Sequence, residues 1–170
     1  RALKMHGGGP KVTPGKPLAR EYREENLELV KKGLVNLEAH LELMKKFGLP
    51  AVVAINAFPG DSEAEWAAVR EAALKAGAAD AVVTKNWAEG GDGAVELARA
   101  VERAASGPST AAPLYGLDLP LKAKIECLAT EVYGAASVSY SPEAESKLET
   151  YSKLGYGNLP ICMAKTQYSL

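Results

Sequence analysis

The spacing of apolar and polar residues predicts strands alternating with helices. Apolar residues recur at steps of three and four between about Glu21 and Phe47, as on one face of a long helix. The run "PAVVAIN" that follows is continuously apolar, which is typical of a parallel strand covered on both faces. A helix ending at Gly77, a strand over Asp80–Thr84 and a helix from Val95 to about Ala105 complete the pattern. This alternation predicts the α/β class, with the two strands parallel and adjacent.

Helix-capping residues support these assignments. Ser62 and Glu65 have the S-x-x-E spacing of a capping box at the start of the second helix. Farther along, Ser141 precedes Pro142, a residue that is favoured in the first turn of a helix because its missing N–H is not needed there.

The two ends of the chain have a different pattern. The first seventeen residues contain four glycines and three prolines and are predicted to form a loop. Residues 106–120 are predicted to form a linker or an ordered surface loop. Beyond them we expect a helix over about Leu121–Tyr133, a helix after Ser141, and short strands at "SVSY" and "LPICMA".

Composition excludes several classes of function. The 170 residues are 47% hydrophobic and carry a formal net charge of −1, so no nucleic-acid partner is expected. The longest apolar stretches are far shorter than the roughly 20 residues needed to cross a bilayer, so no membrane is expected either. The two cysteines, Cys127 and Cys162, lack metal-ligand spacing and are interpreted as reduced, buried thiols. With His6 and His40 as the only histidines, no metal site is predicted.

The best candidate for chemistry is the edge where the two strands end. Ligands of open α/β sheets bind beyond the carboxyl ends of the strands, and the loops "NAFPG" and "KNWAEGGDG" begin there. Phe58 and Trp87 should therefore lie close together and could hold a flat heterocycle, such as a pterin or a purine. Asn56 could meet a base edge with both a donor and an acceptor. Alternatively, both aromatic residues simply cover the core and Asn56 bonds to turn amides.

A glycine-rich segment near the start is a second candidate. The "HGGG" run, with His6, Gly7 and Gly8, could form an anion-binding nest, or it could be a flexible turn. "GGDG" lies ahead of a helix, although Asp92 disfavours a phosphate there. No G-x-x-x-x-G-K-[ST] motif is present, so this chain contains no P-loop.

Longer stretches of the sequence resemble a known family. "RALKMHGG", "ENLELVKKGLVNLEAH", "FGLPAVVAINAFPGDSEAE", "NWAEGGDGAVELA", "KIECLATEVYGA" and "LGYGNLPICMAKTQYSL" closely resemble formate–tetrahydrofolate ligase, also called formyltetrahydrofolate synthetase. The resemblance extends over essentially all 170 residues. It implies an ATP-dependent ligase that joins formate to tetrahydrofolate through formyl phosphate and gives 10-formyltetrahydrofolate.

The resemblance also implies an architecture and a set of binding residues. The family fold is a three-layer, parallel-sheet α/β architecture related to P-loop NTPases. The family's phosphate-binding lysine and formyl-phosphate arginine would lie upstream of this segment, so no catalytic residue is expected within it. Phe58, Pro59 and Trp87 match family positions lining the adenine and pterin pocket, with Asn56 beside them. Lys4, His6, Gly7 and Gly8 match a loop near the phosphates, and ATP with Mg²⁺ and tetrahydrofolate would be substrates of the complete enzyme.

We therefore expect part of a nucleotide domain joined to part of a neighbouring α/β domain. The expected divisions are residues 1–20 as an active-site loop region, 21–118 as the α/β portion with the ligand loops, and 119–170 as a helix-rich extension. The segment alone is expected to be inactive and to need the rest of the ligase or other subunits. The resemblance implies a homo-oligomer or part of a larger assembly, in the cytoplasm or mitochondria. The alternative is a non-catalytic structural or interaction subunit derived from that ligase.

Overall fold

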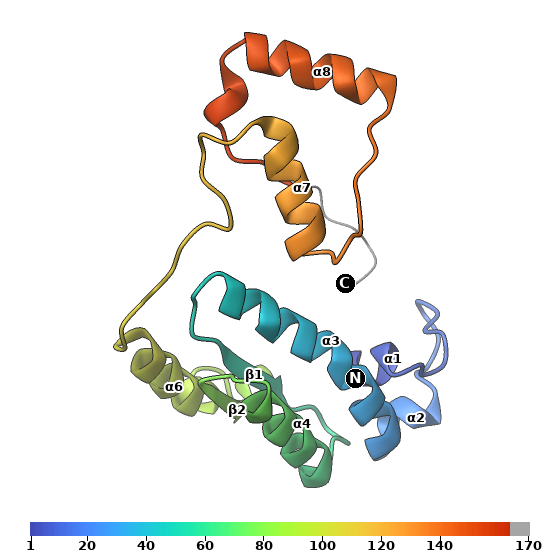
Figure 1. Cartoon of the computed structure of the whole chain (residues 1–170). Coiled ribbons are helices and arrows are strands. Elements are labelled where there is room, and N and C mark those ends of the chain that lie inside the picture. Colours follow the sequence, from blue (N-terminus) through green and yellow to red (C-terminus); the bar gives the residue numbers. More distant parts are fainter. Residues whose placement is uncertain (164–170) are drawn as a thin grey trace. The chain divides into compact units, whose positions relative to one another are not determined.

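The computed structural model describes residues 1–163 and divides the chain into two compact units (Figure 1). Unit 1 is Arg1–Ala111 and unit 2 is Ala112–Leu170. The division lies inside the segment 106–120 that the sequence predicts as a linker or surface loop.

Unit 1 contains both strands of the described chain and the helices around them. Its elements, in order, are α1 (Ala2–His6), α2 (Arg20–Arg23), α3 (Leu27–Lys46), β1 (Val52–Asn56), α4 (Glu63–Lys75), β2 (Asp80–Thr84), α5 (Asn86–Glu89), the 3-10 turn η1 (Asp92–Ala94) and α6 (Val95–Ala105).

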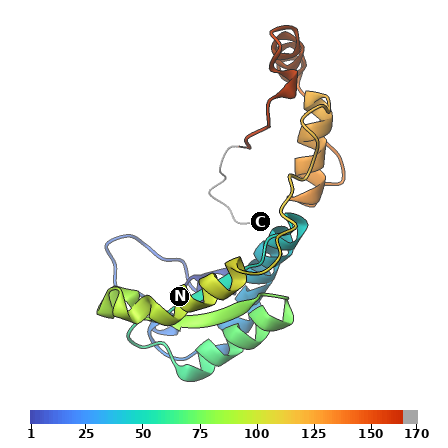
Figure 2. The same ribbon diagram turned by 90° about the vertical axis from the view of Figure 1, so that its left-hand side faces the viewer.

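The two strands pair in parallel, as the sequence predicts. The register runs from Val52 opposite Asp80 to Asn56 opposite Thr84, and α4 connects the strands as a βαβ unit. Both strands therefore end at the same edge of the sheet, and the chain leaves them side by side. Figure 2 shows the strands with helices on either side.

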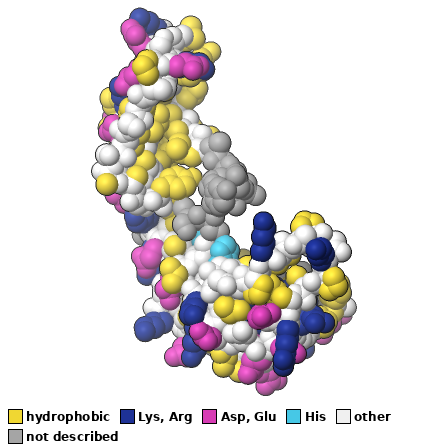
Figure 3. Space-filling model, turned by 90° about the vertical axis from the view of Figure 1, so that its right-hand side faces the viewer, with side chains coloured by type: hydrophobic (Ala, Val, Ile, Leu, Met, Phe, Trp, Pro, Cys, Tyr) yellow, Lys and Arg dark blue, Asp and Glu magenta, His cyan; other side chains and the backbone are white. Residues whose placement is uncertain are grey.

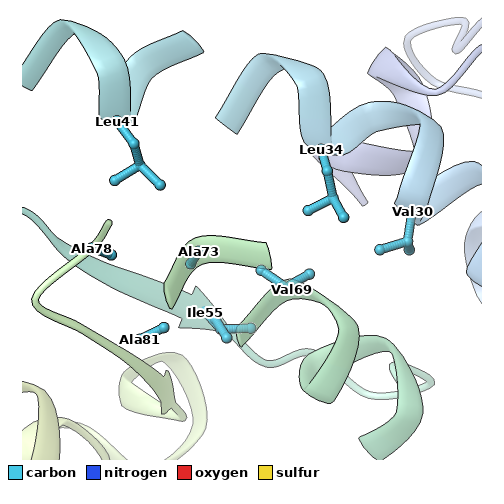
Figure 4. Close-up of a cluster of buried hydrophobic side chains, with 8 residues drawn as sticks. All are labelled: Val30, Leu34, Leu41, Ile55, Val69, Ala73, Ala78 and Ala81. Carbon is cyan, nitrogen blue, oxygen red and sulfur yellow. The ribbon is translucent and has the colours of Figure 1, made fainter. Parts of the chain in front are cut away.

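The core of unit 1 lies between the sheet and the helices α3 and α4 (Figure 4). Ile55 of β1 and Ala81 of β2 point to this face and meet Val69 and Ala73 of α4. The predicted stripe of α3 supplies its half of the core through Val30, Leu34 and Leu41. The apolar periodicity of that helix was thus a correct indicator of its buried face.

One edge of the sheet has no neighbour. Ala57 N–H donates to Thr84 O, and successive strand residues point their backbone groups to alternate edges, so those of Val52 and Ala54 point away from β2. No further strand of residues 1–163 pairs there, and Ala54 is exposed. Because Ala54 lies on the face opposite Ile55, its exposure shows that the prediction of a strand covered on both faces is wrong for the segment itself.

Two further expectations about unit 1 are wrong. Residues 2–6 form α1 rather than a loop, because the glycines and prolines of the first segment begin only at Gly7. The long helix begins at Leu27 rather than Glu21, because the Asn26 side chain accepts a hydrogen bond from Leu29 N–H and caps a new helix there. The preceding residues form the separate one-turn helix α2.

Unit 2 consists of helices and loops in the part of it that is described. Its elements are α7 (Leu121–Glu131), α8 (Pro142–Lys153) and the 3-10 turn η2 (Tyr156–Asn158). The predicted start of α8 is confirmed, since Ser141 Oγ accepts from Ala144 N–H at 3.2 Å.

The two short strands predicted in this unit are wrong as far as residue 163; Ala164, the last residue of "LPICMA", lies outside the described residues. In residues 157–161, side chains form hydrogen bonds with backbone groups that a neighbouring strand would otherwise pair. Lys124 Nζ donates to Gly157 O at 2.6 Å and to Leu159 O at 3.0 Å, and Ile161 N–H donates to Tyr115 Oη at 2.8 Å.

Unit 2 buries little of its apolar surface. Within its described part, only Leu121 and Lys124 are buried, and Figure 3 shows hydrophobic side chains (yellow) on its surface in the upper part of the view. The large exposed ones are Leu117, Leu119, Tyr133, Tyr151, Leu154, Tyr156, Leu159 and Met163. Both cysteines are free, but Cys162 is exposed and Cys127 only half-buried, so the expectation of two buried thiols is wrong.

Candidate functional site

The parallel register brings the two predicted ligand loops to one place. Asn56 ends β1 and lies opposite Thr84, which ends β2. Phe58 and Pro59 follow the first strand, and Trp87 follows the second after only two intervening residues. The side chains that the sequence brought together as candidates therefore start from adjacent strand ends.

Phe58 and Trp87 are in contact, which confirms their expected proximity. Their ring centroids lie 6.0 Å apart and the ring planes are tilted by 48°. Trp87 is 71% exposed, whereas Phe58 is half-buried. An exposed indole beside a fixed phenyl ring offers a stacking surface to a flat ligand.

The sequence predicts a loop for "KNWAEGGDG", but Trp87 lies on the one-turn helix α5. Thr84 organises this turn. Its buried hydroxyl donates to Gly93 O at 3.0 Å and lies 3.3 Å from Asn86 Oδ1, so the strand end, α5 and η1 are tied together. Sequence reasoning missed Thr84; its signal was a polar residue at the end of an apolar strand.

The turn that carries Phe58 is closed on both sides. Asp61 N–H donates to Phe58 O at 3.0 Å, and the Asp61 carboxylate accepts from Phe58 N–H at 3.0 Å. Gly60 has a φ of +92°, and a Cβ on it would lie 2.9 Å from Arg23 O. This turn needs glycine for both reasons, and it fixes the backbone from which the Phe58 ring projects.

Asn56 and Pro59 are both exposed at the edge where β1 and β2 end. This edge, with Phe58 and Trp87, is called the rim below. Asn56 and Phe58 also line a hollow of about 300 Å³. The other walls of the hollow are Arg1–Lys4, Val30, Leu37, Val53–Ile55, Asp61, Glu65, Trp66 and Val69. Within residues 1–163, Trp66 Nε1 is the one buried side-chain nitrogen or oxygen without a hydrogen-bond partner.

Arg1 also reaches the aromatic pair, and sequence reasoning did not single it out. Its guanidinium lies over the Phe58 ring, 5.1 Å from the centroid, in the geometry of a cation–π contact. Arg1 precedes α1, three residues before Lys4. That spacing places the two basic side chains on neighbouring positions of one helical face, which was the available signal.

The structure separates the four residues of the predicted phosphate-side loop. Lys4 is buried, and its ammonium lies 2.7 Å from Glu65 Oε1 and donates to Glu24 O at 2.7 Å. His6 and Gly8 are exposed, and Gly7 packs against α3. A phosphate role for Lys4 would require these buried contacts to be given up, whereas His6 and Gly8 face solvent.

Glu65 is held ionised by its surroundings. Burial alone would raise the pKa of this carboxyl, but the hydrogen bond from Lys4 and the backbone N–H groups of Asn26 and Ser62 outweigh it and hold the pKa below its ordinary value. Ser62 Oγ in turn accepts from Glu65 N–H at 3.2 Å. The predicted cap of α4 is thus confirmed, and Glu65 serves both the cap and the ion pair.

In the described part of the chain, no group of three or more His, Cys, Asp or Glu side chains is arranged to hold a metal ion. No helix among the same residues is long and apolar enough to cross a membrane.

Comparison with known proteins decides the family. The family model described as Formate--tetrahydrofolate ligase matches residues 1–170. The chain belongs to the formate–tetrahydrofolate ligase family. The resemblance seen in the sequence is thereby confirmed.

Relatives within this family are longer proteins. The chain is 54% identical over 170 residues to the cytoplasmic C-1-tetrahydrofolate synthase of Homo sapiens, covering all of this chain and 18% of the relative. Identity is 51% to the mitochondrial C-1-tetrahydrofolate synthase of Saccharomyces cerevisiae and 52% to the mitochondrial monofunctional C1-tetrahydrofolate synthase of Mus musculus, each covered to 17%. The chain thus spans less than a fifth of the length of these members of the ligase family. The binding roles of Asn56, Phe58, Pro59 and Trp87 remain predictions.

Proposed function

We propose that this segment belongs to an ATP-dependent ligase that joins formate to tetrahydrofolate through formyl phosphate, giving 10-formyltetrahydrofolate. Family membership over the whole chain supports this proposal. The single structural observation that carries it is the contact between Phe58 and Trp87 at the adjacent ends of two parallel strands. A rim of that kind suits a substrate with a flat heterocycle, which both ATP and tetrahydrofolate contain.

The role proposed for this segment is to bind and orient a ring. The pterin of tetrahydrofolate or the adenine of ATP stacks on the exposed indole of Trp87, and Phe58 supports its other side. Asn56 offers an amide donor and acceptor to the edge of the ring. Holding the ring fixes the direction in which the rest of the substrate leaves the rim, so the contribution of this segment is to substrate binding.

The phosphoryl-transfer groups are proposed to lie elsewhere in the polypeptide. Phosphoryl transfer needs a phosphate cradle, a basic side chain and a metal ion around the transferred group. The segment has no P-loop motif. We therefore assign ATP phosphates and Mg²⁺ chiefly to residues outside these 170, with His6 and Gly8 as solvent-facing candidates at the phosphate side.

The two-stranded sheet is proposed to be one part of a larger parallel sheet related to those of P-loop NTPases. The unpaired outer edge of β1 supports this, since an additional strand there would pair with its free backbone groups. The exposed apolar side chains of unit 2 support burial against the rest of the ligase or a second copy. The relatives' names suggest cytoplasm or mitochondria as the location.

The test is formate- and tetrahydrofolate-dependent ADP formation by the complete polypeptide. We expect activity from the complete protein, none from residues 1–170 alone, and a reduced rate at low substrate for Phe58→Ala. Val35→Ala is the control, because Val35 is 68% exposed on α3 and does not line the hollow. Product formation by the isolated segment would contradict the assignment, and inactivity of the complete polypeptide would favour the non-catalytic alternative.

A further inference from the structure

A buried ion pair between Lys4 and Glu65 lines the same hollow as Phe58. The side chains of Lys4 and Glu65 are 1% and 6% exposed, and Lys4 Nζ lies 2.7 Å from Glu65 Oε1. Taking two charges out of water costs several kcal/mol per ion unless pairing and hydrogen bonds compensate. Such a pair is weak evidence for stability, but it fixes the distance and direction between the elements that carry it.

This pair joins three separate pieces of unit 1. Lys4 projects from α1 and also donates to Glu24 O, while Glu65 lies in the first turn of α4 and accepts from Asn26 N–H at 2.6 Å. Asn26 is itself the cap of α3. The start of α3, the start of α4 and the whole of α1 are thus held at one buried point.

Glycines allow α1 to lie unusually close to α3. A Cβ on Gly33 would lie 1.9 Å from Leu3 O, and a Cβ on Gly7 would lie 2.0 Å from Leu29 O. With backbone against backbone on one side and an ion pair on the other, the five-residue helix α1 has little freedom to slide or rotate. A helix this short would not be stable alone.

Both ends of the ion pair lead to Phe58. On one side, Lys4 fixes α1, and the residue before α1 is Arg1, whose guanidinium covers the Phe58 ring at 5.1 Å. On the other side, Glu65 lies one helical turn beyond Asp61, whose carboxylate accepts from Phe58 N–H. The pair therefore sets the position of the Phe58 backbone and of the cation that lies on its ring.

We propose that Lys4 and Glu65 are positioning residues of the ring-binding site, which hold Arg1 and Phe58 in register so that the Phe58 side of this site is fixed before the substrate arrives. This inference rests on the proposed function, because it assumes that the Phe58 and Trp87 rim binds substrate. Neither Lys4 nor Glu65 reaches the rim. They act through the turn and through Arg1, so their loss changes substrate affinity rather than the chemical step.

The test compares variants of the complete ligase by the dissociation constants of ATP and tetrahydrofolate, by kcat, and by melting temperature. Lys4→Met removes the cation, Glu65→Gln keeps the acceptor for Asn26 but removes the charge, and Arg1→Gln leaves the ion pair intact. Leu41→Ala is the stability control, because Leu41 is a core residue of α3 outside the lining of the hollow.

We expect Lys4→Met, Glu65→Gln and Arg1→Gln to weaken binding of the substrate that Trp87→Ala also affects, by on the order of tenfold, because a displaced Phe58 ring loses an aromatic contact worth about that much. The affinity for the other substrate and kcat should change by less than about twofold. Arg1→Gln should weaken binding of that one substrate without lowering the melting temperature. A residue with a merely structural role would not show this combination.

The inference is overturned if Lys4→Met and Glu65→Gln lower the melting temperature as Leu41→Ala does but leave both affinities unchanged. Unchanged affinities in Arg1→Gln would also overturn it, even if Lys4→Met failed to fold. A Trp87→Ala effect without effects at Lys4, Glu65 and Arg1 contradicts only the positioning role. If Trp87→Ala changes neither affinity, the ring site itself is wrong and the inference falls with it.

Discussion

The rings of Phe58 and Trp87 meet at 6.0 Å between centroids, with their planes tilted by 48°. A flat ring held between two aromatic faces needs roughly 3.5 Å on each side, or about 7 Å between parallel planes. The pair as it stands is therefore too close and too tilted to enclose a ligand. Since Trp87 is 71% exposed on the one-turn helix α5, its indole can turn outward without opening the core. We expect substrate binding to move Trp87 and to leave Phe58 in place.

The close approach of α1 to α3 makes Gly33 intolerant of a side chain. Alanine usually stabilises a helix interior by about 1 kcal/mol relative to glycine. At Gly33 the added Cβ would lie 1.9 Å from Leu3 O, so Gly33→Ala should instead destabilise the protein and displace α1. Thermal unfolding of the complete ligase measures this. Gly91→Ala is the control, because a Cβ there meets nothing within 4 Å, and equal melting temperatures for the two variants would contradict the close packing.

The ionisation of Glu65 predicts a dependence of stability on pH. Its folded pKa lies below the ordinary value, so the Glu65 contribution is fully present above the unfolded pKa of about 4.3 and is lost as pH falls through the lower folded value. Glu65→Gln should remove this part of the acid destabilisation. Urea unfolding between about pH 3 and pH 6 measures it, with Glu28→Gln in the exposed Glu28–Lys32 pair as the comparison. The same acid dependence in Glu65→Gln as in the parent would show that the buried pair contributes nothing.

Much of unit 1 could be predicted because its signals are local. The parallel strands, the cap at Ser62, and the proximity of Phe58 and Trp87 all follow from apolar runs and from the rule that parallel strands end at one edge. Helix α1 could not be predicted, since five residues carry too little periodicity and its position depends on Gly33 of α3, far along the chain. The ion pair between Lys4 and Glu65 likewise joins residues that no local pattern connects.

Unit 2 was predicted less well for a related reason. The apolar residues of "SVSY" and "LPICM" have the composition of strands, but a strand needs a neighbour and none is present among the described residues of this unit. The backbone of residues 157–161 bonds instead to Lys124 and Tyr115. A buried lysine that organises a turn leaves no mark in hydrophobic periodicity.

Lys124 should therefore control the order of that turn. It is fully buried, and its ammonium holds the carbonyls of Gly157 and Leu159. Lys124→Met should lower the free energy of local opening of this turn by about 3 kcal/mol, because two hydrogen bonds to a charged group are lost and each is worth about 1.5–3 kcal/mol. Hydrogen exchange at the amides of Leu159 and Ile161 measures the loss. Lys122→Met on the same helix should change it little, since Lys122 is 44% exposed, and unchanged exchange in Lys124→Met would contradict this role.

The central claim is that Trp87 binds a planar substrate ring, and Trp87→Ala in the complete ligase tests it most directly. Substrate affinities and melting temperature are measured together, with Val35→Ala, at an exposed position of α3, as the control. We predict that binding of ATP or of tetrahydrofolate weakens by about 1–3 kcal/mol, from lost stacking and contact area. The melting temperature should stay unchanged, because an exposed rim residue leaves no core cavity. A strongly lowered melting temperature with both affinities intact would show that Trp87 only covers the core, and would contradict the account.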